Sequence, residues 1–446
     1  MAIGVEPRTD MDSTSQQAGT PPQYRLSEVG VVPADWAVDS LQAALLSTPS
    51  YGINAAAVGY DENLPTYIRI TDIDEEGRFR SSPRVSVAHA EASRFFLGPN
   101  DLVFARTGAS VGKSYLYDER DGPLVFAGFL IRVTPDPQQL LPGFLAYYAQ
   151  SRRYWDWVAS SSVRSGQPGI NAQQYGKLLL PLPTLGEQRA IAEALSDVDE
   201  LLRSLDALVA KKQAIKQAAI QQLLTGRTRL PGFSGTWKIK RLADLGATYG
   251  GLTGKSRADF VGGNARYVTF LNVLNNVALD PHGVGTVRVA PAESQNRVQM
   301  GDLLFNGTSE TPGDLAMAAV VGFEEPELYL NSFCFGFRPH DKEEYSPLFI
   351  AHFFRASPGR QIMYALAQGA TRYNMSKSQF MALSLPLPPC DEQLAIAKVL
   401  SDMDAEIAAF ERRREKTHAI KLGMMQQLLT GRIRLVEPTT VSEASA

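Results

Sequence analysis

The chain has 446 residues, of which 44% are hydrophobic and 20% are charged, and a net charge of −3 at pH 7. This length is too great for one ordinary core and suits about two to four domains, and no apolar run approaches the roughly 20 residues of a membrane helix. The small negative charge argues against a protein that holds nucleic acid by bulk electrostatics. Any such binding therefore needs local positive charge or a partner.

The N-terminal segment, residues 1–23, is polar and rich in Ser, Thr and Gln. It lacks the basic start and the apolar stretch of a signal peptide, so we expect a cytoplasmic protein with a disordered tail there. Cys334 and Cys390 lie far apart, and Cys334 stands in an apolar run, which predicts reduced thiols and no disulfide frame.

A β-rich domain is predicted over residues 24–177. The stretch Tyr67–Ile73 is rich in β-branched and aromatic residues, and Gly and Pro punctuate the domain throughout, which predicts a mixed, strand-dominated fold. Near its end an aromatic helix is predicted over 144–158, and the polar loop 162–167 follows.

A hinge and a long helix are predicted over residues 178–230. The segment Leu180–Pro183 (Leu-Pro-Leu-Pro) cannot propagate a helix, so we interpret it as a hinge. Apolar residues then recur alternately every four and three positions, which is the heptad seam of a coiled coil. The seam consists of Ile191, Leu195, Val198, Leu202, Leu205 and Val209. With a stop at Gly226, this predicts a helix of about 40 residues, or about 60 Å.

The same order of elements follows a second time. A second β-rich domain is predicted over 231–382, with a strand at Tyr267–Val273, an aromatic helix over 349–366 and a polar loop at 369–374. A second hinge and helix are predicted over 383–436, and a disordered tail over 437–446. The second seam consists of Ile396, Leu400, Met403, Ile407 and Phe410, and Gly431 supplies the stop.

The two halves are related by internal repetition. Pro181 recurs as Pro386 at a shift of 205 positions (386 − 181), and over 178–230 roughly half of the paired positions are identical without a gap. Upstream, Asp101–Phe104 matches Asp302–Phe305 more weakly. The helices therefore do the same job twice, whereas the diverged domains do different jobs.

Two copies related by repetition usually pack about a pseudo-two-fold axis, which makes like helices antiparallel. The predicted fold class is α+β, with two β-rich mixed domains separated by two long antiparallel helices that form a coiled-coil spacer.

The polar loops carry side chains suited to contacting base edges and phosphates in a groove. Segments 106–110 and 306–309, which follow the matched Asp-Leu-x-Phe strands, form a second candidate set. For any single residue the alternative is a solvated turn. The candidate DNA-binding residues are Arg69, Arg106, Thr107, Arg164, Ser165, Gln167, Asn306, Thr308, Thr371, Arg372, Tyr373 and Asn374.

The repeated pattern of Pro-Leu-Pro, Glu-Gln, an Ala-Ile-Ala-led helix and a terminal Leu-Leu-Thr-Gly-Arg closely resembles Type I restriction-modification specificity subunits, over nearly the whole chain except the tails. The resemblance implies two target-recognition domains, each contacting one half of a split, asymmetric site in double-stranded DNA, with the helices setting the gap. It also implies two modification methyltransferase subunits and restriction translocase subunits as partners.

The two repeated helix starts offer two equivalent surfaces for holding partner subunits, with helix capping and core packing as the alternative. The candidates are Glu187, Gln188, Leu195, Glu392, Gln393 and Leu400.

We expect no catalytic role, no cofactor and no metal. Two segments resemble a P-loop, Gly108–Ser114 and Gly250–Ser256. Each has three residues between its glycines where the motif needs four, so neither is predicted to be a P-loop. The five histidines and two cysteines show no metal-ligand spacing. The main alternative function is a two-headed protein–protein adaptor with a coiled-coil spacer and no DNA role, and a second is a fragment of a fused methyltransferase.

Overall fold

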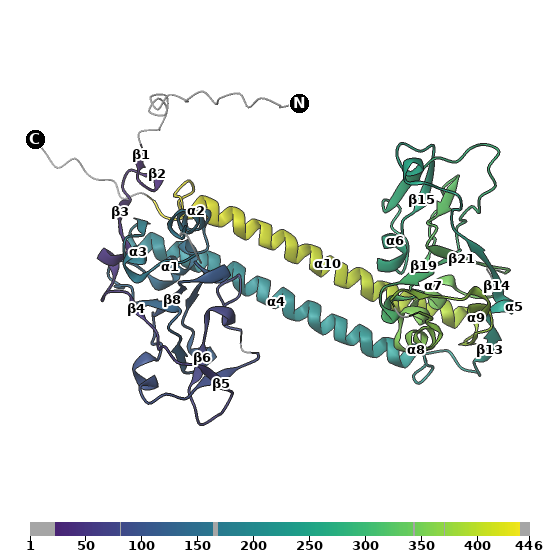
Figure 1. The fold of residues 1–446 in the computed structure, drawn as a ribbon, viewed down its shortest axis with the longest axis horizontal. Helices are drawn as coiled ribbons and strands as arrows, with labels where there is room; N and C mark the ends of the chain where they lie inside the picture. The colour runs from purple at the N-terminus through teal and green to yellow at the C-terminus, as the bar shows by residue number, and fades with distance from the viewer. Residues whose placement is uncertain (1–22, 81, 164–167, 342–343, 370, 438–446) are drawn as a thin grey trace, which may run out of the picture. The chain divides into compact units, whose positions relative to one another are not determined.

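The computed structural model describes residues 23–437 with the exception of 81, 164–167, 342–343 and 370. The chain forms two compact units (Figure 1). Unit 1 comprises residues 1–204 and 414–446, and unit 2 comprises residues 205–413. Each unit thus contains one β-rich domain and parts of both long helices. The two predicted tails lie almost entirely outside the described residues.

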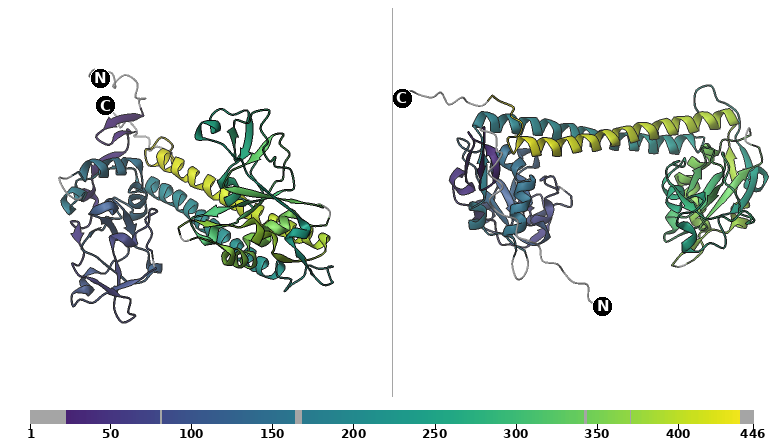
Figure 2. Two further views of the ribbon diagram at one scale, coloured as in Figure 1. Left: turned by 45° about the vertical axis from the view of Figure 1, so that its right-hand side comes forward. Right: turned by 90° about the horizontal axis from the view of Figure 1, so that it is seen from above.

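The long helices are α4 (Leu185–Leu223) and α10 (Cys390–Leu428), each of 39 residues. In unit 1, Leu195 near the start of α4 shares a core with Leu428 at the end of α10. In unit 2, Leu223 at the end of α4 shares a core with Leu400 near the start of α10. Within each unit the helices therefore pack antiparallel, as all views show (Figures 1 and 2), and the predicted fold class is confirmed.

The helix ends and the seam follow the sequence pattern. Gly226 and Gly431 both adopt φ of +67°, a conformation that glycine adopts at no steric cost. Where the seam turns polar, ion pairs replace apolar contacts. Lys421 Nζ lies 2.8 Å from Asp199 in unit 1, Lys216 binds Asp404 in unit 2, and the Lys212–Glu406 pair at 2.6 Å lies one helical turn away from it.

The Pro-Leu-Pro segments, which were predicted as hinges, are strands that pair with other strands. In unit 1, β12 (Leu179–Leu182) pairs antiparallel with β3 (Ala37–Ser40). In unit 2, β23 (Ser384–Leu387) pairs with β13 (Lys238–Arg241) in the same way. Proline is tolerated because each of these is a two-stranded sheet in which every strand has a free edge.

The domain of unit 1 contains two four-stranded sheets. The first has the order β10-β6-β7-β5, with β10 and β6 parallel, and the second has the order β4-β11-β8-β9. The strands are β1 (Tyr24–Ser27), β2 (Gly30–Pro33), β4 (Ser50–Tyr51), β5 (Ala57–Gly59), β6 (Thr66–Ile68), β7 (Val85–Val87), β8 (Leu102–Ala105), β9 (Ser114–Leu116), β10 (Leu124–Phe126) and β11 (Leu130–Val133). The short helices are α1 (Pro142–Tyr148), α2 (Arg152–Ser161) and α3 (Ala172–Gly176).

The domain of unit 2 has a related topology. Its sheet β14-β21-β17-β19 matches β4-β11-β8-β9 strand for strand, and β15 and β20 form a parallel pair like β6 and β10. The strands are β14 (Gly246–Gly250), β15 (Ala265–Val268), β16 (Val284–Val287), β17 (Leu303–Asn306), β18 (Thr308–Ser309), β19 (Ala318–Val320), β20 (Leu328–Leu330), β21 (Cys334–Pro339) and β22 (Tyr373–Asn374). The helices are α5 (Leu242–Leu245), α6 (Phe270–Asn275), α7 (Pro347–Arg355), α8 (Ser357–Leu366) and α9 (Lys377–Met381).

Two predicted strands are shorter than expected. The stretch 67–73 leaves β6 after Ile68 and turns into a 3-10 helix, and the stretch 267–273 leaves β15 after Val268 and enters α6. Local capping explains both changes. The Asp72 carboxylate accepts from the Arg69 backbone N–H at 2.9 Å, and the Thr269 hydroxyl accepts from the Asn272 backbone N–H at 3.2 Å.

Each predicted aromatic helix is two helices. In unit 1 the break falls between α1 and α2, where Ser151 Oγ accepts from the Tyr154 backbone N–H at 3.3 Å and starts α2. In unit 2 the break falls at Ala356, and Pro358 lies in the first turn of α8, where a proline costs no hydrogen bond. Cys334, which stands in an apolar run of the sequence, is buried at 4% exposure.

Candidate nucleic-acid interface

In unit 1, two polar loops that lie far apart in the sequence meet. The Ile170 backbone N–H donates to the Arg106 carbonyl at 2.9 Å, and the Gly108 N–H donates to the Pro168 carbonyl at 3.1 Å. Residues 106–110, which follow β8, and residues 168–170, beyond α2, therefore form one composite surface, loop pair 1. Arg164, Ser165 and Gln167 lie outside the described residues.

Unit 2 builds the equivalent surface with a small sheet. β18 pairs antiparallel with β22, so that Thr308 faces Asn374 and Ser309 faces Tyr373. The Met375 backbone N–H donates to the Gly307 carbonyl at 3.0 Å and extends the contact. We call residues 306–309 and 371–375 loop pair 2. In both units, the segment after the Asp-Leu-x-Phe strand is thus joined to the loop beyond the aromatic helices.

Loop pair 2 borders a cavity of about 360 Å³. Its apolar wall is formed by Phe270, Leu274 and Phe333, and its polar lining includes Thr308, Ser309, Glu310 and Arg372. The Arg372 guanidinium lies 5.4 Å from the centroid of the Phe333 ring. In such a cavity the cation can bind phosphates, the hydroxyls and the carboxylate can bind base edges, and the apolar wall can contact base faces.

The DNA-binding candidates differ in how accessible they are. Thr371, Arg372 and Asn374 are exposed, while Thr107, Thr308 and Tyr373 are half-buried.

Two of the candidate arginines of unit 1, Arg69 and Arg106, are partly committed elsewhere. The guanidinium of Arg69 donates two hydrogen bonds to Asp72, from Nε to Oδ2 at 2.9 Å and from Nη2 to Oδ1 at 2.8 Å, and these bonds raise the pKa of Arg69. The guanidinium of Arg106 lies 4.7 Å from the centroid of the Tyr51 ring.

Asn306 requires a correction. It is fully buried, and its amide donates to the carbonyls of Thr308 (3.1 Å) and Asp314 (2.7 Å) and accepts from the Met317 N–H (2.6 Å). All of these contacts are internal to unit 2. Asn306 therefore shapes loop pair 2 from beneath and cannot contact DNA in this conformation.

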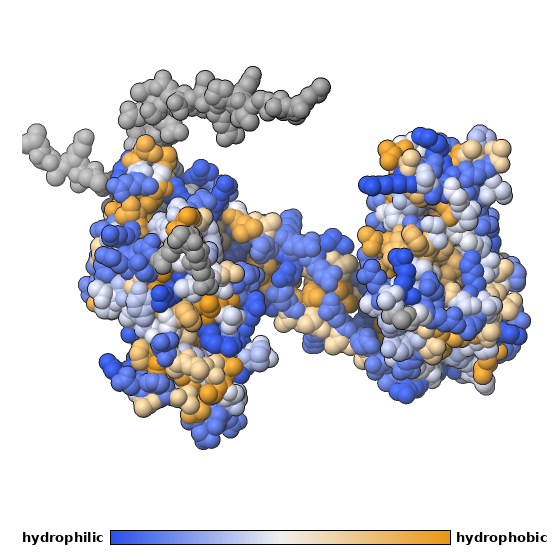
Figure 3. Space-filling view, in the orientation of Figure 1, coloured by the Kyte–Doolittle hydropathy of each residue, from blue (hydrophilic) through white to orange (hydrophobic). Residues whose placement is uncertain are grey.

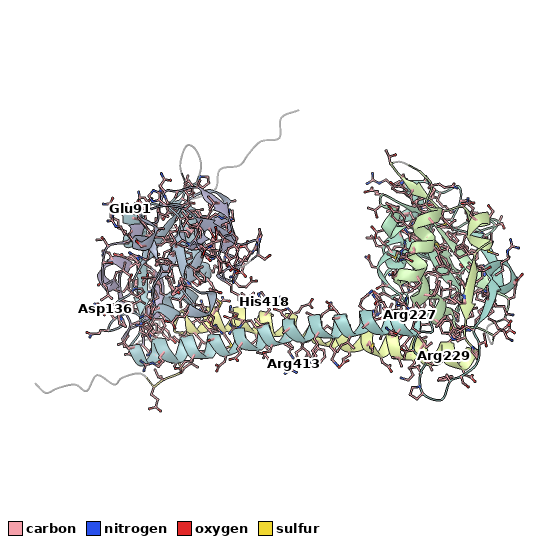
Figure 4. The ribbon with its side chains drawn as sticks, turned by 90° about the horizontal axis from the view of Figure 1, so that it is seen from below. Glu91, Asp136, Arg227, Arg229, Arg413 and His418 are labelled. Carbon is pink, nitrogen blue, oxygen red and sulfur yellow. The ribbon has the colours of Figure 1, made fainter. Side chains whose placement is uncertain are left out.

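The glutamates proposed to hold partner subunits are buried in ion pairs inside their own units. Glu187 is fully buried, and its carboxylate accepts from Trp36 Nε1 at 3.0 Å and from Arg434 Nη2 at 2.7 Å. We call these three residues clasp 1. In unit 2, fully buried Glu392 is bound by Arg229, which Figure 4 labels, and the Arg229 guanidinium lies 5.9 Å from the centroid of the Trp237 ring. We call these three residues clasp 2.

The remaining partner candidates are buried as well. Gln188 accepts from the Leu141 N–H at 2.8 Å and donates to the Pro183 carbonyl at 3.0 Å, and Gln393 accepts from the Ser346 N–H at 3.0 Å. Leu195 and Leu400 lie in the two cores at 0% exposure. The interpretation of these residues as an open docking surface is therefore corrected: they close each unit, because their polar atoms are satisfied internally and their apolar atoms are packed.

Two matched grooves lie against the helices. Groove 1, in unit 1, has a volume of about 390 Å³ and is lined by Tyr147, Ser196 and Asp199 among others. Groove 2, in unit 2, has a volume of about 850 Å³ and is lined by the residues found 205 positions later, which are His352, Ser401 and Asp404.

The chemistry at the floor of the two grooves is similar but not identical. In groove 1 the Tyr147 hydroxyl donates to Asp199 at 2.9 Å. In groove 2 His352 Nε2 lies 3.4 Å from the Ser401 hydroxyl, and burial lowers the pKa of His352 to about 4. The imidazole therefore stays neutral near pH 7, and Asp404 is neutralised by Lys216 instead.

In the described part of the chain, no group of three or more His, Cys, Asp or Glu side chains is placed to hold a metal ion. Within the same residues, every helix is too short or too polar to cross a bilayer.

Comparison with known proteins identifies one family. The model of the type I restriction modification DNA specificity domain matches the chain twice, over residues 66–217 and 234–417. The type I restriction enzyme EcoKI specificity subunit of Escherichia coli is 24% identical over 433 residues, covering 91% of this chain and 90% of that protein. The MjaVIII specificity subunit of Methanocaldococcus jannaschii is 20% identical over 434 residues, covering 91% and 94%.

Solved structures show the same fold. The type I restriction-modification system S subunit from M. genitalium superposes with a TM-score of 0.54 at 14% identity, over 88% of this chain and 96% of that one. A chain from a structure of type I R-M complex assembly gives a TM-score of 0.54 at 17% identity, over 90% and 99%.

Proposed function

Since the chain belongs to the type I restriction-modification DNA specificity family, we propose that its two domains, residues 24–177 and 231–382, each recognise one half of a split, asymmetric site in double-stranded DNA. The chain is the DNA sequence-specificity subunit of such a system and not its catalytic component. The observation that carries the proposal is that the family model matches once in each repeat, and each match contains a loop pair built in the same way. Nothing favours the adaptor alternative.

Loop pairs 1 and 2 are the proposed base-contacting surfaces. In unit 2, Thr308, Thr371, Arg372 and Asn374 present two hydroxyls, a guanidinium and an amide within one small sheet and its adjoining turn. Arginine pairs with guanine and asparagine with adenine in the major groove, so these side chains suffice to select a short sequence. In unit 1, Thr107 and the candidates in residues 164–167 would do the equivalent work. Because the two loop pairs differ in sequence, the two half-sites differ too.

We also propose two modification methyltransferase subunits and restriction translocase subunits as partners, and a cytoplasmic location where these partners and the DNA meet. Grooves 1 and 2 support the stoichiometry, since two equivalent sites suit two copies of one partner. Partners would also add positive charge that a chain with a net charge of −3 lacks.

The experiment is selection of duplexes from a random pool by the chain together with its modification subunits. We expect one bipartite site, bound more tightly than random DNA by about 4–10 kcal/mol, with an affinity that falls steeply with salt. The variants Arg372→Ala and Asn374→Ala should relax one half-site and leave the other unchanged. Arg412→Ala, an exposed arginine on α10, is the matched control and should leave both half-sites intact. Selection of one contiguous word, or of none, would contradict the proposal.

The docking proposal has its own test. Ser196→Arg should block groove 1 and Ser401→Arg should block groove 2, so that each variant binds one modification subunit where the unchanged chain binds two, as measured by native mass spectrometry. Retention of two subunits by both variants would place docking elsewhere.

A further inference from the structure

Two phenylalanines occupy matched places beside the loop pairs. Phe129 is 56% exposed and Phe333 is 50% exposed, although most phenylalanines of the chain are buried or half-buried. Each stands directly before the strand next to the Asp-Leu-x-Phe strand, β11 in unit 1 and β21 in unit 2. Hydrophobic residues appear on the surface of each unit (Figure 3), and a single one needs no explanation, but a repeated placement does.

The local geometry is the same in both units. In unit 1 the Leu130 N–H donates to the Ala127 carbonyl at 2.8 Å, and in unit 2 the Cys334 N–H donates to the Asn331 carbonyl at 3.0 Å. These bonds close four-residue turns that place each phenylalanine third, at the tip. Each turn leads directly into a strand of a four-stranded sheet, β11 in unit 1 and β21 in unit 2, which anchors the turn.

The turn tips are joined directly to the loop pairs. The Phe129 carbonyl accepts from the Arg106 N–H at 3.0 Å, and the Phe333 carbonyl accepts from the Gly307 N–H at 2.8 Å. In unit 2 the Arg372 guanidinium also lies over the Phe333 ring. The two rings therefore border the two surfaces that we assign to DNA.

A residue shared by two domains that recognise different sequences cannot supply the difference between them. Phenylalanine has no hydrogen-bonding group in its side chain, so it cannot distinguish base edges by donors and acceptors. A stiffly held apolar ring beside a base-contacting surface can instead enter between base pairs, unstack them and bend the duplex, independently of sequence.

On this basis, and resting on the proposed function, we propose that Phe129 and Phe333 are matched DNA wedges, each entering a base step in its own half-site and bending the duplex there. The unstacking costs a few kcal/mol, which contacts formed by the bent duplex offset. The loop pairs select the sequence, and the wedges deform it.

The test uses the complex of the full chain with its modification subunits and the bipartite duplex selected by the unchanged complex. Dyes flank one half-site at a time, and energy transfer between them reports the local bend. The unchanged complex should raise energy transfer across both half-sites. Phe129→Ala and Phe333→Ala should each abolish the rise across one half-site only, and weaken specific binding roughly 5- to 150-fold, the range for losing one aromatic–base contact.

Controls separate a wedge from general damage. Phe333→Trp keeps a large ring and should retain the bend. Leu26→Ala in unit 1 and Ile239→Ala in unit 2 remove apolar residues that are 60% and 77% exposed, and both should leave affinity and bend unchanged.

Three results would overturn the inference: unchanged bending in both alanine variants, an unbent duplex in the unchanged complex, or an altered recognised sequence with the bend preserved, which would make the phenylalanines sequence readers. In all three cases the unchanged complex still selects its bipartite site. Failure of that selection would instead contradict the proposed function.

Discussion

Replacing Arg434 by alanine is expected to destabilise unit 1 and to leave unit 2 unaffected. Clasp 1 holds Glu187 at 0% exposure, and the side chain of Arg434 is itself only 15% exposed. Without the guanidinium, the Glu187 carboxylate would stay buried with Trp36 Nε1 as its remaining side-chain donor among the described residues. Breaking a buried ion pair from one side costs about 3–5 kcal/mol, because the other charge loses its compensation.

The structure allows this magnitude to be compared between the clasps. The indole N–H of Trp36 keeps a bond to Glu187, and such a bond to a charged group contributes about 1.5–3 kcal/mol. In clasp 2 the indole nitrogen of Trp237 makes no hydrogen bond in the described structure, so Arg229→Ala leaves Glu392 with less compensation. We therefore expect a loss of about 3 kcal/mol for Arg434→Ala and a larger loss for Arg229→Ala.

Native-state hydrogen exchange on the full chain measures these losses unit by unit. Arg434→Ala should lower protection in β3 and β12, and Arg229→Ala in β13 and β23. The double variant Glu187→Gln with Arg434→Met removes the buried charge together with its partner, and should be more stable than Arg434→Ala alone. A loss below about 1 kcal/mol, or one shared equally by both units, would refute the reasoning.

Three further predictions concern unit 2 and the helices. Because burial lowers the pKa of His352 from 6.5 to about 4, the unfolded chain binds a proton between these values that the folded chain does not. The contribution of neutral His352 to the free energy of unfolding should thus be fully present above pH 6.5, and this free energy should fall by up to about 1.4 kcal/mol per pH unit towards pH 4. Urea titrations should show a weaker pH dependence of the free energy of unfolding for His352→Tyr, which copies Tyr147. An equal slope in the variant would count against the reasoning. In Gly336→Ala the new Cβ would lie 2.0 Å from Cζ of Tyr249, and this ring cannot move freely because its hydroxyl is bound to Asp302 at 2.6 Å. Thermal unfolding should therefore show that the free energy of unfolding falls by about 1–3 kcal/mol. Gly322→Ala, whose new Cβ would have nothing within 4 Å, should show no such loss. Inserting one helical turn into both α4 and α10 should change the gap between half-sites while the bases within each half stay the same, as read from methylated positions in the genome; altered bases within a half-site would contradict this.

The features predicted correctly from the sequence are those carried by local or repeated patterns. The heptad spacing from Ile191 onward and its copy from Ile396 depend only on residues a few positions apart. Both helices, and their ends shortly before Gly226 and Gly431, could therefore be predicted without knowing any partner. The fixed shift of 205 positions, as between Pro181 and Pro386, likewise allowed the two-fold architecture to be predicted from the sequence.

Tertiary structure decided everything that depends on a distant partner. The Glu-Gln pairs at the helix starts look like exposed polar turns, but Glu187 is buried, and its charge is compensated by Arg434, which lies 247 positions away. Asn306 faces inward because the carbonyl of Asp314 and the N–H of Met317 need its amide. The turns that expose Phe129 and Phe333 were likewise invisible, since burial is set by what packs against a residue and not by its own hydrophobicity. A linear pattern specifies which elements form, while the free energy of satisfying buried polar groups specifies which side chains remain available at the surface.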